Sequence, residues 1–297
     1  MAIRLGDNQY GKAEVRVVRV DRGQRDGDAH ELRDLNVSIA LGGDLAAVHL
    51  TGDNANVVPT DTQKNTVFAF AKEASPGEIE EFGLRLARHF VDDFEPISRA
   101  QVAIEEYAWA RIDVGGAPHP HAFRSAGAEK RLTTVTRQDG RDWVVSGLTD
   151  LVVLKTTGSE FWGYICDRYT TLAETTDRIL ATAVTARWRF AHLDVDWAES
   201  FRETRRLLVE TFAGHHSLSL QQTLYRMGEV VLTERSEICE IRMSMPNKHH
   251  FVVDLTPFGL ENEKEVFYAD DRPYGLIQGA VERDGAPEPG QAWLSWN

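Results

Sequence analysis

The sequence is poor in cysteine and in long apolar runs. Only two cysteines, Cys166 and Cys239, occur among its 297 residues, so neither a disulfide framework nor a cysteine-rich zinc site can be built. This scarcity predicts a protein of the reducing cytoplasm. No apolar run reaches the roughly 18 residues of a membrane-spanning helix, and the first residues, MAIRLGDNQYGK, lack the apolar core of a signal peptide.

Clustered positive charge is also missing. The formal net charge is -13, and the sequence contains no block of basic residues. We therefore expect neither nucleic-acid binding through phosphate neutralisation nor attachment to an anionic membrane. The G-x-S-x-G, P-loop and G-x-G-x-x-G motifs are absent, which removes sequence support for a serine hydrolase, a nucleotide hydrolase or a Rossmann domain. We expect the partners to be small molecules or other protein subunits.

What the chain does contain is a doubled order of periodic segments. Alternating residues predict a hairpin over 12–20 and 31–41, and helical stripes follow over 60–73 and 78–94. Strands return at 99–112, 119–123, 130–137 and 143–155. The second half repeats the order, with a strand near 184–190, helices opening at 196 and 219, and strands at 239–245 and 249–255.

Four segments have the form of helix starts, and one of them is Asp196 to Glu199. Thr60-x-x-Gln63 and Ser219 to Gln222 are typical of capping boxes, and Ser75-Pro76-Gly77-Glu78 places proline in the first helical position. The doubled order predicts two similar α+β units whose helices cover one face of an antiparallel sheet. We place the first at residues 1–138 and the second at 139–297. The Pro- and Gly-rich tail from Asp284 should lie extended on a surface, and Trp293 and Trp296 suggest that this surface belongs to a neighbouring element or subunit.

The stretch from Phe161 to Arg178 has the residues of a recognition surface. A phenylalanine ring can lie on a flat heterocycle, and the planar fork of an arginine can donate two parallel hydrogen bonds to a ring nitrogen beside a carbonyl. The alternative is that Phe161 and Leu172 belong to the core and Arg178 is a solvated surface charge.

Histidine pairs raise the question of a metal site. His119 and His121 could share one face of a strand, whereas adjacent residues such as His249 and His250 point to opposite faces. No HExxH motif accompanies them, so we expect no metal site.

Five segments together resemble the urate oxidase (uricase) family. They are Asn8–Lys12, Val58–Thr66, Tyr169–Leu172 with Asp177–Arg178, Leu220–Tyr225 and Pro246–His249. They follow the family's order and spacing from residue 8 to about residue 279, which is nearly the whole chain. One departure is Pro59, where the family is expected to carry a small residue such as alanine; proline stiffens the approach to the following helix and puts the rate in doubt more than the reaction.

The resemblance implies a fold and an assembly. The fold is the tunnelling fold (T-fold), with two β-β-α-α-β-β units per chain. Two subunits close a barrel, two barrels stack into a homotetramer, and each active site lies between subunits. In such a shared site, one chain contributes Lys12, Val57, Thr60 and Asp61. The partner chain contributes Phe161, Leu172, Arg178, Leu220, Gln221, Asn247 and His249.

The resemblance also implies the reaction, in which urate, O2 and water give 5-hydroxyisourate and hydrogen peroxide with no metal or organic cofactor. Phe161 and Arg178 match the shape and charge of a flat, anionic purine, and Gln221, in the first turn of its helix, offers an amide donor and acceptor. Leu172 and Leu220 supply an apolar wall.

The protein's own task is then to move protons and place reactants. Lys12 acts as the base through the Thr60 hydroxyl, His249 completes this relay, and Asn247 holds O2 and then peroxide or water above the ring. Each residue also has a plainer interpretation: Thr60 as a helix cap, Lys12 as a strand-edge charge, His249 as a core histidine and Asn247 as a turn former.

Two other functions stay open on the residues alone. One is a metal-dependent hydrolase or cyclohydrolase that acts on a pterin or purine and holds its metal with the histidine pairs. The other is a purine-binding protein without catalysis.

Overall fold

The computed structural model describes residues 3–23 and 28–294, and it forms two compact units. Unit 1 comprises Met1–Gly147, His192–Ala198 and Pro287–Asn297, and unit 2 comprises Leu148–Ala191 and Glu199–Ala286. The domain limits drawn from the sequence, 1–138 and 139–297, stay a prediction. Among the described residues, no helix is long and apolar enough to cross a membrane.

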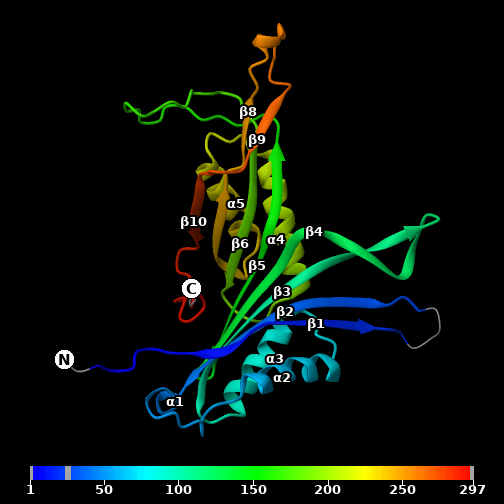
Figure 1. Cartoon of the computed structure of the whole chain (residues 1–297), viewed down its shortest axis with the longest axis vertical. Helices are drawn as coiled ribbons and strands as arrows, with labels where there is room; N and C mark the ends of the chain where they lie inside the picture. Colours follow the sequence, from blue (N-terminus) through cyan, green and yellow to red (C-terminus); the bar gives the residue numbers. More distant parts are fainter. Residues whose placement is uncertain (1–2, 24–27, 295–297) are drawn as a thin grey trace. The chain divides into compact units, whose positions relative to one another are not determined.

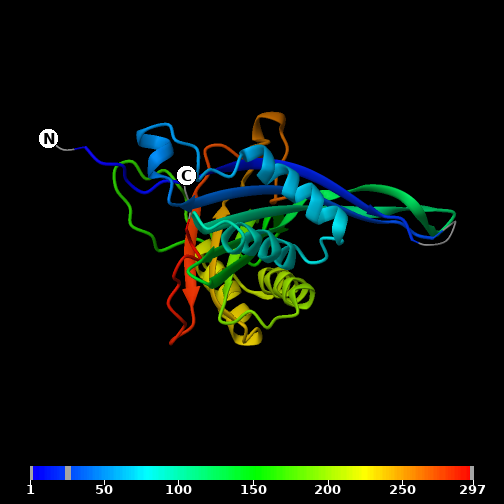
Figure 2. The same ribbon diagram turned by 90° about the horizontal axis from the view of Figure 1, so that it is seen from below.

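Unit 1 is a sheet with helices against it. Its strands follow the order β1 (Tyr10–Asp21), β2 (Glu31–Gly43), β3 (Ile97–Val114), β4 (Ala117–Gln138) and the first half of β5 (Arg141–Lys155), and the β1–β2, β2–β3 and β3–β4 pairs are antiparallel. Helix α1 (Ala46–Leu50) is short. Helix α2 (Thr60–Glu73) packs on β1, and α3 (Ile79–Asp92) packs on β3 and β4, so both helices run along one face of the sheet (Figures 1 and 2).

Unit 2 has the same kinds of element in the same order. The second half of β5 is followed in the sheet by β6 (Leu180–Phe190), β7 (Ile238–Pro246) and β10 (Leu276–Glu282), with antiparallel β6–β7 and β7–β10 pairs. Helix α5 (Leu220–Glu234) packs on β7 and β10. Helix α4 (Trp197–Gly214) meets β6 where Phe201 stacks on Trp188. A separate hairpin joins β8 (His249–Val252) to β9 (Phe267–Asp270), with the short 3-10 helix Thr256–Phe258 between them.

One glycine in each unit lets a helix approach its sheet closely. A Cβ added to Gly83 in α3 would lie 2.8 Å from Cγ2 of Val135, and one added to Gly228 in α5 would lie 2.6 Å from Cγ2 of Val281. Any larger residue would push the helix away from a close-packed core. The two units therefore share this packing detail as well as their element order.

The α+β class, with antiparallel strands and helices, is confirmed, but two helix starts are wrong. Helix α2 begins at Thr60 itself with Pro59 as its N-cap, so Thr60 does not cap it, and Gln63 donates instead to the Val58 carbonyl at 3.2 Å. Helix α3 begins at Ile79 rather than at a proline, because Gly77 adopts a left-handed conformation with φ of 61° that interrupts the helix. The strands predicted at 119–123 and 130–137 are parts of one long strand, β4.

The end of the chain packs on unit 1 without forming a strand. Ala292 is buried, and the carbonyl of Leu294 accepts a hydrogen bond from Nε2 of Gln101 at 2.7 Å. The neighbouring element is thus β3 of the same chain. Trp296 lies outside the described residues.

Candidate functional site

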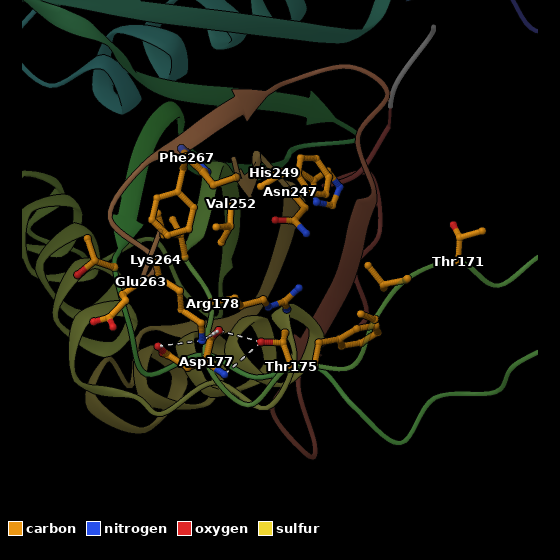
Figure 3. Close-up of a pocket in the computed structure, with 17 residues that line it drawn as sticks. Thr171, Thr175, Asp177, Arg178, Asn247, His249, Val252, Glu263, Lys264 and Phe267 are labelled. Atoms are coloured by element: carbon orange, nitrogen blue, oxygen red, sulfur yellow. Dashed lines mark hydrogen bonds and ion pairs between the residues drawn. The ribbon is translucent and has the colours of Figure 1, made fainter. Parts of the chain in front are cut away.

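Unit 2 contains a pocket of about 810 Å³. It lies where the loop between β5 and β6 meets the turn from β7 into β8 (Figure 3). Five residues expected in the site line it, and Figure 3 shows Asn247 and His249 on the wall that faces Arg178 and Thr175. The five are Phe161, Leu172, Arg178, Asn247 and His249.

The loop from 159 to 178 is closed by its own backbone. Phe161 and Thr175 form an isolated antiparallel bridge, with N–H···O distances of 2.8 and 3.0 Å, and the N–H of Arg178 donates to the carbonyl of Ser159 at 2.9 Å. These bonds bring the two ends of the loop side by side. The guanidinium carbon of Arg178 consequently lies 5.1 Å from the centroid of the Phe161 ring, within cation–π range.

Arg178 is a half-buried cation without an acidic partner. Burial lowers the pKa of its guanidinium, which stays charged at any physiological pH. Within the described part of the chain it forms no ion pair, and its one side-chain hydrogen bond runs from Nε to Oγ of Ser159 at 3.4 Å. An uncompensated cation beside an aromatic face is suited to a flat anion. The interpretation of Arg178 as an ordinary solvated charge does not fit this burial.

The opposite wall comes from the turn between β7 and β8. Asn247 donates its backbone N–H to the carbonyl of Gly275 at 2.8 Å, and the N–H of Lys248 donates to the carbonyl of Ala181 at 2.8 Å. His249 opens β8, where its ring stacks on Phe251 with centroids 5.7 Å apart. Backbone bonds on both sides of the turn therefore hold Asn247 and His249 in place.

Leu172 lies on the pocket rim, with 55% of its surface exposed. It is not a core residue, so the alternative offered for it from the sequence is wrong. Nearby, Nζ of Lys264 donates to the carbonyl of Asp177 at 3.1 Å, which ties the segment between β8 and β9 to the residue before Arg178 (Figure 3).

Leu220 and Gln221 are not among the residues that line this pocket in the described part of unit 2. They form the first turn of α5, with Leu220 buried and Gln221 exposed. Oγ of Ser219 accepts the N–H of Gln222 at 3.1 Å, and Oε1 of Gln222 accepts the N–H of Leu218 at 2.9 Å. Ser219 is confirmed as the N-cap of α5, but Gln222 bonds to the residue before the cap and not to the N–H of Ser219, so the reciprocal pair of a capping box is not formed.

The remaining expected site residues, Lys12, Val57, Thr60 and Asp61, belong to unit 1. Lys12 lies in β1 opposite Ile39, immediately before a bulge in which Glu14 has a φ of 56°. Thr60 and Asp61 open α2, where both side chains are exposed.

Electrostatics connects two members of this group. The pKa of Asp61 is lowered, chiefly by a hydrogen bond from Lys64 and to a smaller degree by the charge of Lys12. Thr60 and Asp61 lie in the first turn of α2, Val57 lies just before it, and α2 packs on β1, the strand that carries Lys12. Five of the unit 2 residues come together at one pocket.

The pocket also contains residues for which the sequence predicted no role in the site. Phe251 and Phe267 come from the β8–β9 hairpin, and Thr175 and Asp177 come from the loop. Alternation in such short strands was too brief to place the two rings, and a loop side chain carries no periodic signal. His250 lines the pocket too, although it neighbours His249 in the strand.

The histidine pairs form no evident metal cage. Across residues 3–23 and 28–294, no group of three or more His, Cys, Asp and Glu side chains is placed to hold a metal ion. The rings of His119 and His121 do share a face and contact edge to face, with centroids 4.5 Å apart.

The fold places the chain among α+β proteins built from antiparallel sheets with helices packed on them. A family model described as Uricase matches residues 8–136 and 144–278. A uricase of Arthrobacter globiformis is 50% identical over 289 residues, which cover 97% of this chain and 93% of that protein. A uricase of Dictyostelium discoideum is 37% identical over 281 residues, covering 94% and 97%.

Solved structures agree with these sequence matches. The crystal structure of uricase from Arthrobacter globiformis superposes with a TM-score of 0.91 at 49% identity, covering 97% of this chain and 98% of that one. A uricase from Bacillus fastidious superposes with a TM-score of 0.80 at 25% identity, covering 95% and 94%. The chain belongs to the uricase family.

Proposed function

We propose that this protein is a urate oxidase of purine breakdown, which converts urate, O2 and water to 5-hydroxyisourate and hydrogen peroxide. Membership of the uricase family supports the reaction. The observation that carries the proposal is the pocket in which Arg178, Phe161, Asn247 and His249 meet. A planar cation above an aromatic ring, facing an amide and an imidazole, matches a flat anionic purine.

No cofactor is needed in the reaction that we propose. An ionised urate is rich enough in electrons to reduce O2: two electrons and two protons end on the peroxide, and the oxygen of water is added to the ring. The protein's contribution is therefore proton transfer and placement. Lys12 removes a proton through the Thr60 hydroxyl, His249 completes the relay, and Asn247 holds the oxygen species above the ring.

The remaining expected residues bind and shield the substrate. Gln221 complements a ring N–H beside a carbonyl, Leu172 and Leu220 exclude water, and Val57 and Asp61 belong to the same half of the site as Thr60. We further propose the tandem T-fold units at 1–138 and 139–297, the barrel closed by two subunits, and a cytoplasmic homotetramer with sites shared between subunits. The separation of the expected residues into a unit 1 group and a unit 2 group is compatible with a shared site.

The test is to follow urate absorbance, dissolved O2 and peroxide together, with metal-stripped protein in chelator. We expect urate and O2 to fall in a one-to-one ratio while peroxide accumulates. Turnover that returns only with added metal would contradict the cofactor-free reaction. Persistent urate under both conditions would contradict the oxidase itself and direct the search to pterins and other purines.

A further inference from the structure

A buried serine, Ser159, lies directly behind the cation of the pocket. It is 0% exposed, its Oγ accepts from Nε of Arg178 at 3.4 Å, and its carbonyl accepts the backbone N–H of the same arginine at 2.9 Å. Ser159 is thus the one residue that holds both the backbone and the side chain of Arg178 within the described chain.

The contact to Nε determines which nitrogens remain for a ligand. A guanidinium can present either Nε with one terminal nitrogen or both terminal nitrogens to a carbonyl-and-nitrogen edge. With Nε directed at Ser159, the two terminal nitrogens have no protein partner among the described residues. Arg178 therefore faces the pocket end-on, which means that it presents its two terminal nitrogens and not Nε with one of them.

Ser159 is in turn fixed to the start of helix α5. It forms an isolated parallel bridge with Ser217, in which the N–H of Ser217 donates to the carbonyl of Gly158 at 2.9 Å and the N–H of Glu160 donates to the carbonyl of Ser217 at 2.7 Å. Oγ of Ser217 donates to the carbonyl of Ser219 at 3.0 Å, two residues before Gln221.

A second buried hydroxyl reinforces this connection. Thr223, in the first turn of α5, donates to Oγ of Ser217 at 2.7 Å, and both residues are 0% exposed. Buried hydroxyls that are fully bonded rigidify the elements they join. The loop that carries Arg178 and the helix turn that carries Gln221 are consequently held as one rigid element.

From this geometry we infer that Ser159 is a positioning residue for substrate binding: it orients the Arg178 fork end-on, and through its bridge to Ser217 it sets the spacing between Arg178 and Gln221. The inference rests on the proposed function for the identity of the ligand. Ser159 touches no reacting atom, so its effect is confined to how well the purine edge is bound.

The test is a double-mutant cycle of wild type, Ser159→Ala, Arg178→Lys and the double variant. The readouts are KM and kcat for urate and the inhibition constant of xanthine, a purine that shares the six-membered ring edge. For Ser159→Ala we expect KM and the inhibition constant to rise roughly 5- to 10-fold, as for a long hydrogen bond to a charged group, while kcat changes less than about twofold.

Coupling is the decisive part of the cycle. Once Ser159 is alanine, the fork is already poorly oriented, so Arg178→Lys should cost roughly 5- to 10-fold less affinity than it does in the wild type. Additive effects would overturn the inference. The matched control is Ser200→Ala. Ser200 lies in α4 and is also buried, and its hydroxyl donates to Glu237 at 2.8 Å, so removing it should leave KM unchanged.

A second variant and the activity of the wild type distinguish a folding defect, a wrong proposed function and a wrong inference from one another. Should Ser159→Ala not fold, Ser159→Cys, which replaces the hydroxyl with a weakly accepting thiol, tests the same contact to Arg178, and an unchanged KM in a folded Ser159→Cys would overturn the inference. A wild type that does not oxidise urate would overturn the proposed function and this inference with it. An active wild type with an additive cycle would overturn the inference alone.

Discussion

The phenol of Tyr10 forms two hydrogen bonds with a single residue, Val58. Its oxygen accepts the N–H of Val58 at 2.8 Å and donates to the Val58 carbonyl at 3.1 Å. Burial raises the pKa of this phenol, so it stays a neutral donor throughout the neutral range. The pair fastens the start of β1, two residues before Lys12, to the segment that leads into Thr60.

Tyr10→Phe should therefore weaken the proposed proton relay more than urate binding. The variant leaves the N–H of Val58 without its partner, whereas the Val58 carbonyl keeps the bond from Gln63; losing the phenol costs about 1–3 kcal/mol of unfolding free energy. Turnover should fall because Lys12 and Thr60 lose their common anchor, while KM stays close to the wild-type value. Steady-state kinetics and urea unfolding would measure both effects. Tyr225→Phe, at an exposed position of α5, is the control, and a rise in KM with unchanged kcat would contradict the expectation.

Lys12→Ala should abolish turnover and preserve most of the affinity for urate. The reason is that a general base acts in the transition state, whereas the pocket that we propose for the purine belongs to unit 2. A fall in kcat of roughly 100-fold or more is expected, with a xanthine inhibition constant within about threefold of wild type. Lys72→Ala, at the exposed end of α2, should remain active. Equal activity of both variants would remove Lys12 from the mechanism.

Mixed subunits test whether the site is shared. Lys12→Ala and Arg178→Ala chains are each expected to be inactive, because one lacks the base and the other the anion-binding fork. On unfolding and reassembly as a mixture, some sites should combine an intact Lys12 with an intact Arg178, so part of the wild-type activity should return. No recovery from a mixture that reassembles normally would show that each site lies within one chain.

Arg178→Lys should weaken urate binding severely. A lysine keeps the positive charge but replaces the planar fork with a point charge, so two parallel hydrogen bonds become at most one. We expect KM to rise roughly 100-fold. Arg226→Lys, an exposed arginine paired with Glu229 on α5, provides the control. Near-normal affinity of Arg178→Lys would mean that charge alone, and not the fork, is recognised.

The contact between Glu160 and His216 predicts a pH-dependent contribution to stability. Nε2 of His216 lies 2.6 Å from Oε1 of Glu160, and Nε1 of Trp162 donates to the other carboxylate oxygen at 2.6 Å. These bonds lower the pKa of Glu160 in the folded protein. A carboxyl with a lowered pKa stabilises the fold above its ordinary pKa of about 4.3, and this contribution is lost as the pH falls from there towards the folded pKa.

Comparing wild type with Glu160→Gln by urea unfolding across pH 3 to 7 tests this contribution. The difference in unfolding free energy should be largest above roughly pH 4.3 and should shrink below it. Glu210→Gln, which alters an exposed pair with Arg206 on α4, should show a much smaller change. A Glu160→Gln difference that is constant with pH would mean that the carboxylate charge contributes nothing.

Periodicity and turn chemistry were sufficient to predict most elements. Strand alternation marked β1, β2 and β7, and the cap at Ser219 fixed the start of α5, because each of these signals is carried by neighbouring residues. The cap of α2 was assigned to the wrong residue for the same reason. A Thr-x-x-Gln pattern looks the same whether or not the preceding proline takes the cap position.

The sequence by itself determined the family and the identities of the expected site residues, since five short segments in one order and spacing need no knowledge of their neighbours in space. Tertiary structure decided which of these residues meet. Phe161 and Arg178 come together because a backbone bridge to Thr175 and the carbonyl of Ser159 close the loop between them. Such bonds join backbone groups that every residue carries, so no side-chain pattern records them.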